Sequence, residues 1–143
     1  MKEIIRAKGA PCPTSGPYSQ AIKTGNTLFI AGISGEKPIS WELAGGGEDI
    51  TAETTQVMEN LKAILEEAGG TLEDLVSVQL FIKDPAIMPE FNAVYRSYLK
   101  EGAFPTRIAA VVTGFVGTKA NFELNAIAVI DLKHAFTGFT LNE

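Results

Sequence analysis

Apolar runs separated by turn-forming residues divide the chain into short strands, loops and two helices. Residues 19–33 contain two such runs around Thr24-Gly25-Asn26, which predicts a β-hairpin because glycine and asparagine readily adopt turn conformations. Residues 35–50 are rich in glycine, proline and serine and form the longest predicted loop, in which we expect Trp41 to pack rather than line a ligand cleft. Three further runs rich in β-forming residues predict strands, at 75–82, 106–113 and 121–130.

Two helices are predicted by apolar residues that recur every three or four positions. For the first, Thr51 is a candidate N-cap and Gly69-Gly70 ends the pattern. Its apolar stripe comprises Val57, Leu61, Ile64, Leu65 and Ala68. The second helix follows Asp84-Pro85 and ends at Gly102, with a stripe of Phe91, Val94, Tyr95, Tyr98 and Leu99. The predicted order is therefore β-β-α-β-α-β-β.

This order predicts an α+β fold with one layer of helices on a mixed sheet. Each helix connects two strands, and right-handed crossovers place both helices on the same face of the sheet. No change in composition and no linker divides the chain, so a single domain is expected. The other face of the sheet stays uncovered, and self-association is the simplest way to bury it.

Composition disfavours several classes of function. The formal net charge is −5 and Lys and Arg are scattered singly, which argues against nucleic-acid binding. No apolar run is long enough for a signal peptide or a membrane-spanning helix, so we expect a cytoplasmic protein without a membrane partner. The single cysteine, Cys12, and the single histidine, His134, lie at opposite ends of the chain. A Cys/His metal site or a histidine-based catalytic triad is therefore not expected.

The last two predicted strands carry polar residues at defined positions. Alternation places Arg107 and Ala109 on one face of the first strand, and Glu123 and Asn125 on the polar face of the second. The intervening loop is short enough for an antiparallel pair, and the predicted register sets Asn125 opposite Arg107 with Glu123 on the diagonal. The three side chains would then meet at one spot on the sheet.

Two interpretations of Arg107 follow from this arrangement. The arginine either forms a structural ion pair with Glu123, or binds the carboxylate of a ligand through its planar guanidinium. The small side chains of Ala109 and Ala110 leave room for such a ligand. An arginine buried without any anionic partner would destabilise the fold, so one of the two interpretations must supply an anion. The residue pattern alone does not decide between them.

Several short motifs, in this order along the chain, resemble those of one family. They are GPYSQ at 16–20, NLKAIL at 60–65 with EAG at 67–69, FNAVY at 91–95, FPTR at 104–107 and ELNAIAV at 123–129. Together they cover roughly residues 3–131 in the family's order, and the combination is specific. The chain is identified by this resemblance as a member of the RidA/YjgF (reactive intermediate deaminase) family.

The resemblance implies a chorismate-mutase-like subunit over residues 1–131 with a C-terminal tail at 132–143. Such subunits form homotrimers with ligand sites between subunits. Archetypal members hydrolyse 2-imino or 2-enamino acids, released by pyridoxal-phosphate dehydratases, to 2-keto acids and ammonia without a metal or cofactor.

The resemblance also assigns roles by position. Arg107 corresponds to the arginine that binds the substrate carboxylate, and Glu123 to the carboxylate near the attacking water. Tyr18 and Asn92 correspond to residues that line the site.

Three positions depart from the family pattern. Ala109 stands where archetypal members have cysteine, Ala31 where they have serine, and Asn125 where they have glutamate. The changed lining keeps an alternative open, a non-catalytic regulatory protein that binds small carboxylates such as keto or amino acids. A ribonuclease or translation-inhibitor role, a label that some members carry, is disfavoured by the acidic charge.

Overall fold

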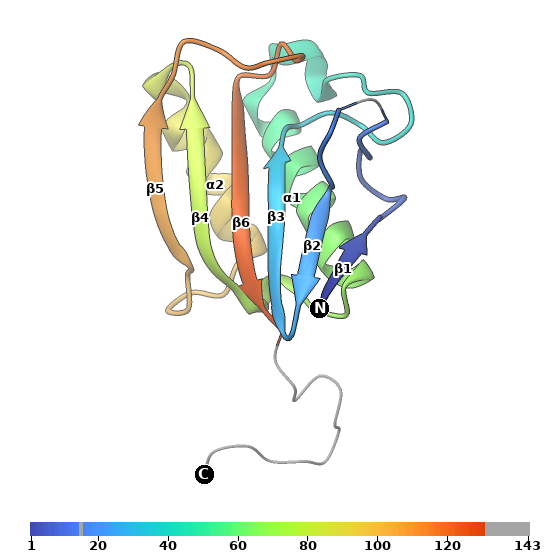
Figure 1. The fold of residues 1–143 in the computed structure, drawn as a ribbon. Helices are drawn as coiled ribbons and strands as arrows, with labels where there is room; N and C mark the ends of the chain where they lie inside the picture. The colour runs from blue at the N-terminus through green and yellow to red at the C-terminus, as the bar shows by residue number, and fades with distance from the viewer. Residues whose placement is uncertain (15, 131–143) are drawn as a thin grey trace.

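The computed structural model describes residues 1–14 and 16–130, so the predicted tail at 132–143 lies outside the described residues. A six-stranded mixed sheet forms one layer, with the strand order β1-β2-β3-β6-β4-β5 (Figure 1). The strands are β1 (Lys2–Ile5), β2 (Ala21–Thr24), β3 (Thr27–Ile33), β4 (Leu75–Ile82), β5 (Thr106–Val111) and β6 (Phe122–Val129).

The second layer consists of α1 (Ile50–Glu67) and α2 (Met88–Tyr98), both on the same face of the sheet (Figure 1). Three short 3₁₀ helices occupy connections: η1 (Ala44–Gly47), η2 (Leu72–Asp74) and η3 (Pro85–Ile87). The predicted fold class, with two helices on one face of a mixed sheet, is therefore confirmed.

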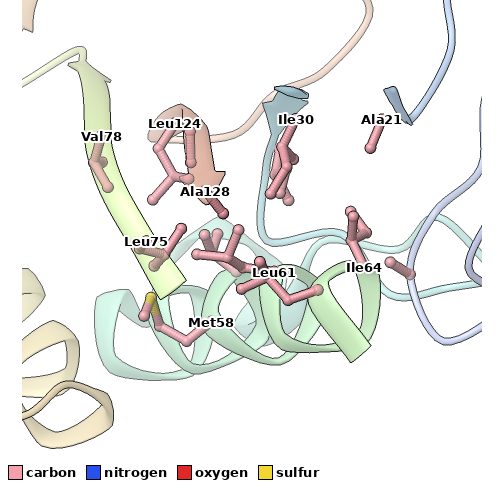
Figure 2. Packing of buried hydrophobic residues seen from close by; sticks show 14 of the residues in the cluster. Ala21, Ile30, Met58, Leu61, Ile64, Leu75, Val78, Leu124 and Ala128 are labelled. Atoms are coloured by element: carbon pink, nitrogen blue, oxygen red, sulfur yellow. The ribbon is translucent and has the colours of Figure 1, made fainter. Parts of the chain in front are cut away.

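The core lies between the helices and the sheet. Met58, Leu61 and Ile64 of α1 point toward apolar side chains of the strands, among them Ile30 and Leu124 (Figure 2). The predicted stripe of α1 is buried throughout, which explains why its helical period was readable from the sequence.

The prediction missed the first strand. β1 pairs antiparallel with β2, from Lys2 opposite Thr24 to Ile5 opposite Ala21. Only Ile5 of its four residues is buried. So short a segment carries no alternation that would distinguish it from a loop, and it is ordered by its pairing with β2.

The predicted N-cap of α1 was also wrong. The helix begins at Ile50, and the carboxylate of Asp49 accepts a hydrogen bond from the Ala52 backbone N–H at 3.0 Å. Thr51 lies inside the first turn. A carboxylate at the N-cap also interacts favourably with the positive end of the helix dipole.

The main correction concerns the last two strands, which are not neighbours. β4 lies between them and pairs parallel with β5 and antiparallel with β6. Four alternate residues of β6 are at most 3% exposed, whereas β5 is mostly exposed. The more completely apolar strand therefore takes a central position, and the crossover through α2 leaves β5 at the edge.

This strand order overturns the predicted meeting of Arg107 with Glu123 and Asn125. Arg107 is in register with Val78, a core residue, so its side chain lies on the helix-covered face. Glu123 is in register with Phe81 and alternates with the buried Phe122 and Leu124, so it lies on the opposite face. The two charged residues occupy opposite faces on strands separated by β4.

No described helix covers that opposite face of the sheet. Strand register places Ile4, Ile22, Phe29 and Ile127 in one row across it, which we call the apolar row. Phe29 is 48% exposed and Ile4 is 41% exposed.

Candidate functional site

A cavity of about 680 Å³ lies beside the end of β3 and the beginning of β6. Four parts of the chain line it: the N-terminal segment between β1 and β2, residues 31–34, 36 and 41, Ile64 of α1, and the loop that leads into β6 together with the start of that strand. Among the side chains that line it are Tyr18, Glu36, Trp41 and Glu123. The expectation that Trp41 packs rather than lines a cleft was therefore wrong.

Glu123 is the half-buried carboxylate of this cavity. Its Oε1 lies against the backbone of β3, since a Cβ on Gly32 would be only 2.6 Å from it. Burial raises the pKa of Glu123, and the negative charge of Glu36 raises it further. Because Gly32 has no side chain, the Glu123 carboxylate can lie against the backbone of β3.

Glu36 is a second carboxylate on the cavity wall, which the sequence analysis missed. The Ser34 hydroxyl donates a hydrogen bond to Glu36 Oε1 at 2.7 Å. Asn60 of α1, which is fully buried, donates from Nδ2 to the Glu36 carbonyl at 2.8 Å and to the Ser34 carbonyl at 3.1 Å. The helix thus fixes the turn that carries Glu36.

A buried glutamate, Glu53, anchors the other side of the cavity. It is fully buried and accepts hydrogen bonds from Asn121, at 2.8 Å from the backbone N–H and 2.7 Å from Nδ2. Asn121 also donates to the Gly47 carbonyl at 2.9 Å. Because Asn121 directly precedes β6, these bonds define where Glu123 enters the cavity.

Gln20 holds the N-terminal wall. Its side-chain carbonyl accepts from the Ala7 N–H at 2.6 Å, and its amide donates to the Pro11 carbonyl at 2.9 Å. This buried side chain lies in the GPYSQ motif, so part of what makes the motif recognisable is structural. Tyr18 of the same motif is 59% exposed at the cavity rim.

Arg107 of β5 belongs to a separate cluster, whose other members lie on α2. Its Nη1 donates a hydrogen bond to Asn92 Oδ1 at 2.8 Å. Its guanidinium carbon lies 5.0 Å from the Tyr95 ring centroid and 5.9 Å from that of Phe91, distances typical of cation–π contacts. In the described chain Arg107 forms no ion pair, since the one ion pair found there joins Arg96 to Glu101.

Tyr95 is the member of this cluster that sequence reasoning did not assign. Its hydroxyl is buried without a hydrogen-bond partner among the described residues. Burial raises the pKa of Tyr95, and the Arg107 charge opposes that effect. Its place in the apolar stripe of the second helix indicated packing and gave no sign of its contact with Arg107.

The predicted site residues therefore divide into two groups. Tyr18, Ala31 and Glu123 line the cavity, which we call the glutamate half-site. Arg107, Asn92 and Ala109 form the arginine half-site, because Ala109 follows Arg107 on the same face of β5. Within one chain the two half-sites lie on opposite faces of the sheet.

In the part of the chain that the structure describes, no three His, Cys, Asp or Glu side chains come together in a way that could hold a metal ion. Over the same residues, no helix has both the length and the apolar composition needed to cross a membrane.

Comparison with known proteins adds a family context. A family model described as Endoribonuclease L-PSP matches residues 9–130. A RutC family protein of Pyrococcus horikoshii is 47% identical over 113 residues, which are 79% of this chain and 86% of that protein.

Two further relatives carry more specific names. A Dermatophagoides farinae protein named 2-iminobutanoate/2-iminopropanoate deaminase is 34% identical over 130 residues, covering 91% of this chain and 98% of that protein. The crystal structure of RidA from an Antarctic Psychrobacter is similar with a TM-score of 0.81 at 36% identity, covering 90% of this chain and 99% of that one.

Proposed function

We propose that this chain, which belongs to the RidA/YjgF family, hydrolyses 2-imino and 2-enamino acids to 2-keto acids and ammonia. The observation that carries the proposal is the Glu123 carboxylate, half-buried in a cavity and with a raised pKa. A carboxylate with a raised pKa is a better base than one in water, which suits it to activate a water molecule. The named deaminase among the relatives supports the same reaction.

The reaction needs little from the protein because an imine carbon is already electrophilic. Glu123 accepts a proton from a water molecule as the water oxygen bonds to that carbon. That proton passes to the nitrogen, which gives a carbinolamine. Glu123 then takes the proton of the new hydroxyl group and delivers it to the nitrogen, so that the C–N bond breaks, the keto group forms and ammonia leaves. Holding the water and the imine in the right orientation accounts for most of the expected acceleration.

Arg107 is the proposed anchor for the substrate carboxylate. A guanidinium has five N–H donors, and the bond to Asn92 leaves others directed toward solvent. Asn92 and the Tyr95 ring fix the orientation of the guanidinium. An exposed guanidinium held in one orientation can donate two parallel hydrogen bonds to the two oxygens of a carboxylate.

Because the two half-sites lie on opposite faces of one chain, we propose that they meet between copies in a homotrimer. The Arg107 of one copy would then approach the Glu123 of a neighbour. The apolar row on the uncovered sheet face supports this assembly, because exposed apolar rows of this kind are typical of interfaces. Tyr18 and Ala31 would contact the substrate from one copy, and Asn92 and Ala109 from the other.

The first experiment measures turnover. A dehydratase generates 2-iminopropanoate or 2-iminobutanoate in situ, and keto-acid release is followed with and without the protein. We expect Arg107→Ala and Glu123→Gln each to lower the acceleration by roughly 100-fold or more. Arg96→Ala is the matched control, because Arg96 is also an exposed arginine that contacts an aromatic ring and should not affect turnover. No acceleration by the wild type, or full activity of Arg107→Ala, would contradict the proposal.

A second experiment tests whether the site is shared. We expect Arg107→Ala and Glu123→Gln chains to be nearly inactive alone and to form mixed trimers when they are co-expressed. About one quarter of the sites in randomly mixed trimers would combine both intact groups, so roughly that fraction of wild-type activity should return. No recovery in confirmed mixed trimers would contradict a site that combines Arg107 of one copy with Glu123 of another.

Other outcomes would identify other functions. Binding of a keto acid that requires Arg107, without turnover, would indicate a carboxylate-binding regulatory protein.

The family model's description also names an endoribonuclease. The cavity instead carries two carboxylates and no Lys, Arg or His among its described lining residues, an arrangement that repels phosphate.

A further inference from the structure

Glu36 gives the cavity an unusual charge. Its side chain is oriented by Ser34 and its backbone is fixed by the buried Asn60, so the carboxylate has a defined position. It lies close enough to Glu123 for each charge to affect the other. Of the two carboxylates on the cavity wall, the deaminase mechanism uses only Glu123, so Glu36 has no assigned role.

The described lining of the cavity supplies no cation to balance the two carboxylates. Lys119 lines a smaller adjoining hollow together with Glu36 and Trp41, but forms no ion pair in the described chain. Two carboxylates in a partly desolvated space repel each other. A cationic group on a ligand would relieve that repulsion.

Aromatic side chains on the same walls favour the same kind of ligand. Trp41 and Tyr18 both line the cavity and both keep part of their surface exposed. The faces of such rings attract organic cations. Carboxylates combined with aromatic rings are a chemistry that recognises ammonium or guanidinium groups.

We propose that the preferred substrate is a 2-imino acid whose side chain ends in a cation, and that Glu36 selects it. This inference rests on the proposed function. The imine carbon lies at Glu123, the substrate carboxylate at Arg107 of the neighbouring copy, and the distal cation at Glu36. A cavity of about 680 Å³ has room for a side chain of that length.

The turnover test compares two substrates of the same shape. A broad-specificity L-amino acid oxidase generates the 2-imino acids of arginine and of citrulline, whose urea group has the shape of guanidinium without its charge. We expect the wild type to show roughly tenfold higher kcat/KM for the arginine-derived substrate. Glu36→Gln should reduce that preference to less than about twofold. Glu42→Gln, an exposed glutamate on the same loop, is the matched control and should keep it.

A binding test works without turnover. Trp41 is the only tryptophan in the chain, so intrinsic tryptophan fluorescence reports on the cavity. Titration with n-butylguanidinium should change the fluorescence saturably, and titration with n-butylurea should not. Glu36→Gln should weaken guanidinium binding by roughly tenfold, whereas Glu42→Gln should leave it unchanged.

The combined outcomes separate the two proposals. Equal handling of the charged and neutral compounds, or a preference that survives Glu36→Gln, overturns the role of Glu36 and leaves the deaminase function intact. Guanidinium binding that depends on Glu36, without turnover of any imine, overturns the deaminase function and supports the cation site. If the wild type shows no turnover of any imine and no charge-selective binding, both proposals are overturned.

Discussion

Gly32 and Glu123 show how one missing side chain makes room for a half-buried carboxylate. Gly32 does not have the positive φ that would require glycine, so an alanine is conformationally acceptable there. What it would disturb is the Glu123 carboxylate, 2.6 Å from the added Cβ. The glycine is therefore required by the position of the carboxylate rather than by the backbone.

We predict that Gly32→Ala lowers deaminase kcat/KM by at least about tenfold, because the flexible carboxylate moves away from its place at β3. The free energy of unfolding should change little. Kinetics and urea denaturation of the same samples measure both effects. Gly114→Ala, where an added Cβ meets nothing within 4 Å, is the control. Wild-type kinetics in Gly32→Ala would show that this contact does not position the base.

The raised pKa of Glu123 predicts a pH-dependent effect on stability. The pKa of Glu123 in the folded state lies above the ordinary 4.5. The contribution of this group to the free energy of unfolding is therefore greatest at low pH, where the carboxyl is protonated, and is lost as the pH rises through the folded pKa. Glutamine stays neutral. In a monomeric background such as Phe29→Glu, where no neighbouring Arg107 lies near the carboxylate, Glu123→Gln should therefore have a higher Tm than the parent at pH 7, and the difference should vanish near pH 4. Thermal melts at both pH values test this, and a lower Tm for the variant at pH 7 would contradict it.

At the scale of elements, α1 organises the glutamate half-site. Its N-terminal part contributes Glu53, which holds Asn121, and its middle contributes Asn60, which holds the turn at Glu36. Both polar residues are fully buried, so their hydrogen bonds are expensive to break. The helix thus positions both ends of the cavity from one rigid element.

We predict that Asp49→Ala destabilises the protein by about 1 kcal/mol, because it removes the side-chain cap of α1. Thr51→Ala should have a clearly smaller effect, since Thr51 lies within the helix. Urea denaturation of the two variants provides the comparison. The reverse order would restore the cap originally assigned from the sequence.

Glu53→Gln tests the anchor at β6. One side-chain oxygen of glutamine can still accept from the Asn121 N–H, but its amide nitrogen would face the Nδ2 donor. Asn121 cannot turn its amide without losing the bond to Gly47. We expect a loss of about 1–3 kcal/mol in the free energy of unfolding, measured by urea denaturation. Glu48→Gln, an exposed glutamate nearby, should be neutral, and equal stability of the two variants would argue against the anchor.

At the scale of the whole molecule, the proposed combination of the two half-sites depends on the uncovered sheet face. Phe29 lies in the middle of the apolar row and is nearly half exposed in one chain. Its replacement should therefore cost the single subunit little. Its burial against another copy would make it important for assembly.

We predict that Phe29→Glu yields folded monomers and lowers deaminase activity at least about tenfold, because a charge in the apolar row prevents its burial. Size-exclusion chromatography with light scattering, circular dichroism and kinetics measure assembly, folding and activity. Ile39→Glu, an exposed residue outside the row, is the control. An active monomer would contradict the shared site.

The sequence by itself determined the elements whose pattern is local. The hairpin at Thr24-Gly25-Asn26, both helical stripes and the strand at 75–82 follow from periodicity and turn chemistry, and the structure has them. Alternation within β6 correctly placed Glu123 away from the core side chains. The motifs identified the family, because they include side chains such as Gln20 and Asn60 that fix the backbone around the site.

Only the tertiary structure decided which elements are neighbours. β4, not β5, lies beside β6, so Arg107 and Glu123 are on opposite faces and one chain holds two half-sites. The approach of Glu36 to Glu123 likewise depends on distant segments brought together by α1. Strand order and such approaches depend on which surfaces are buried across the whole chain and on the crossover geometry. Local periodicity carries no information about either.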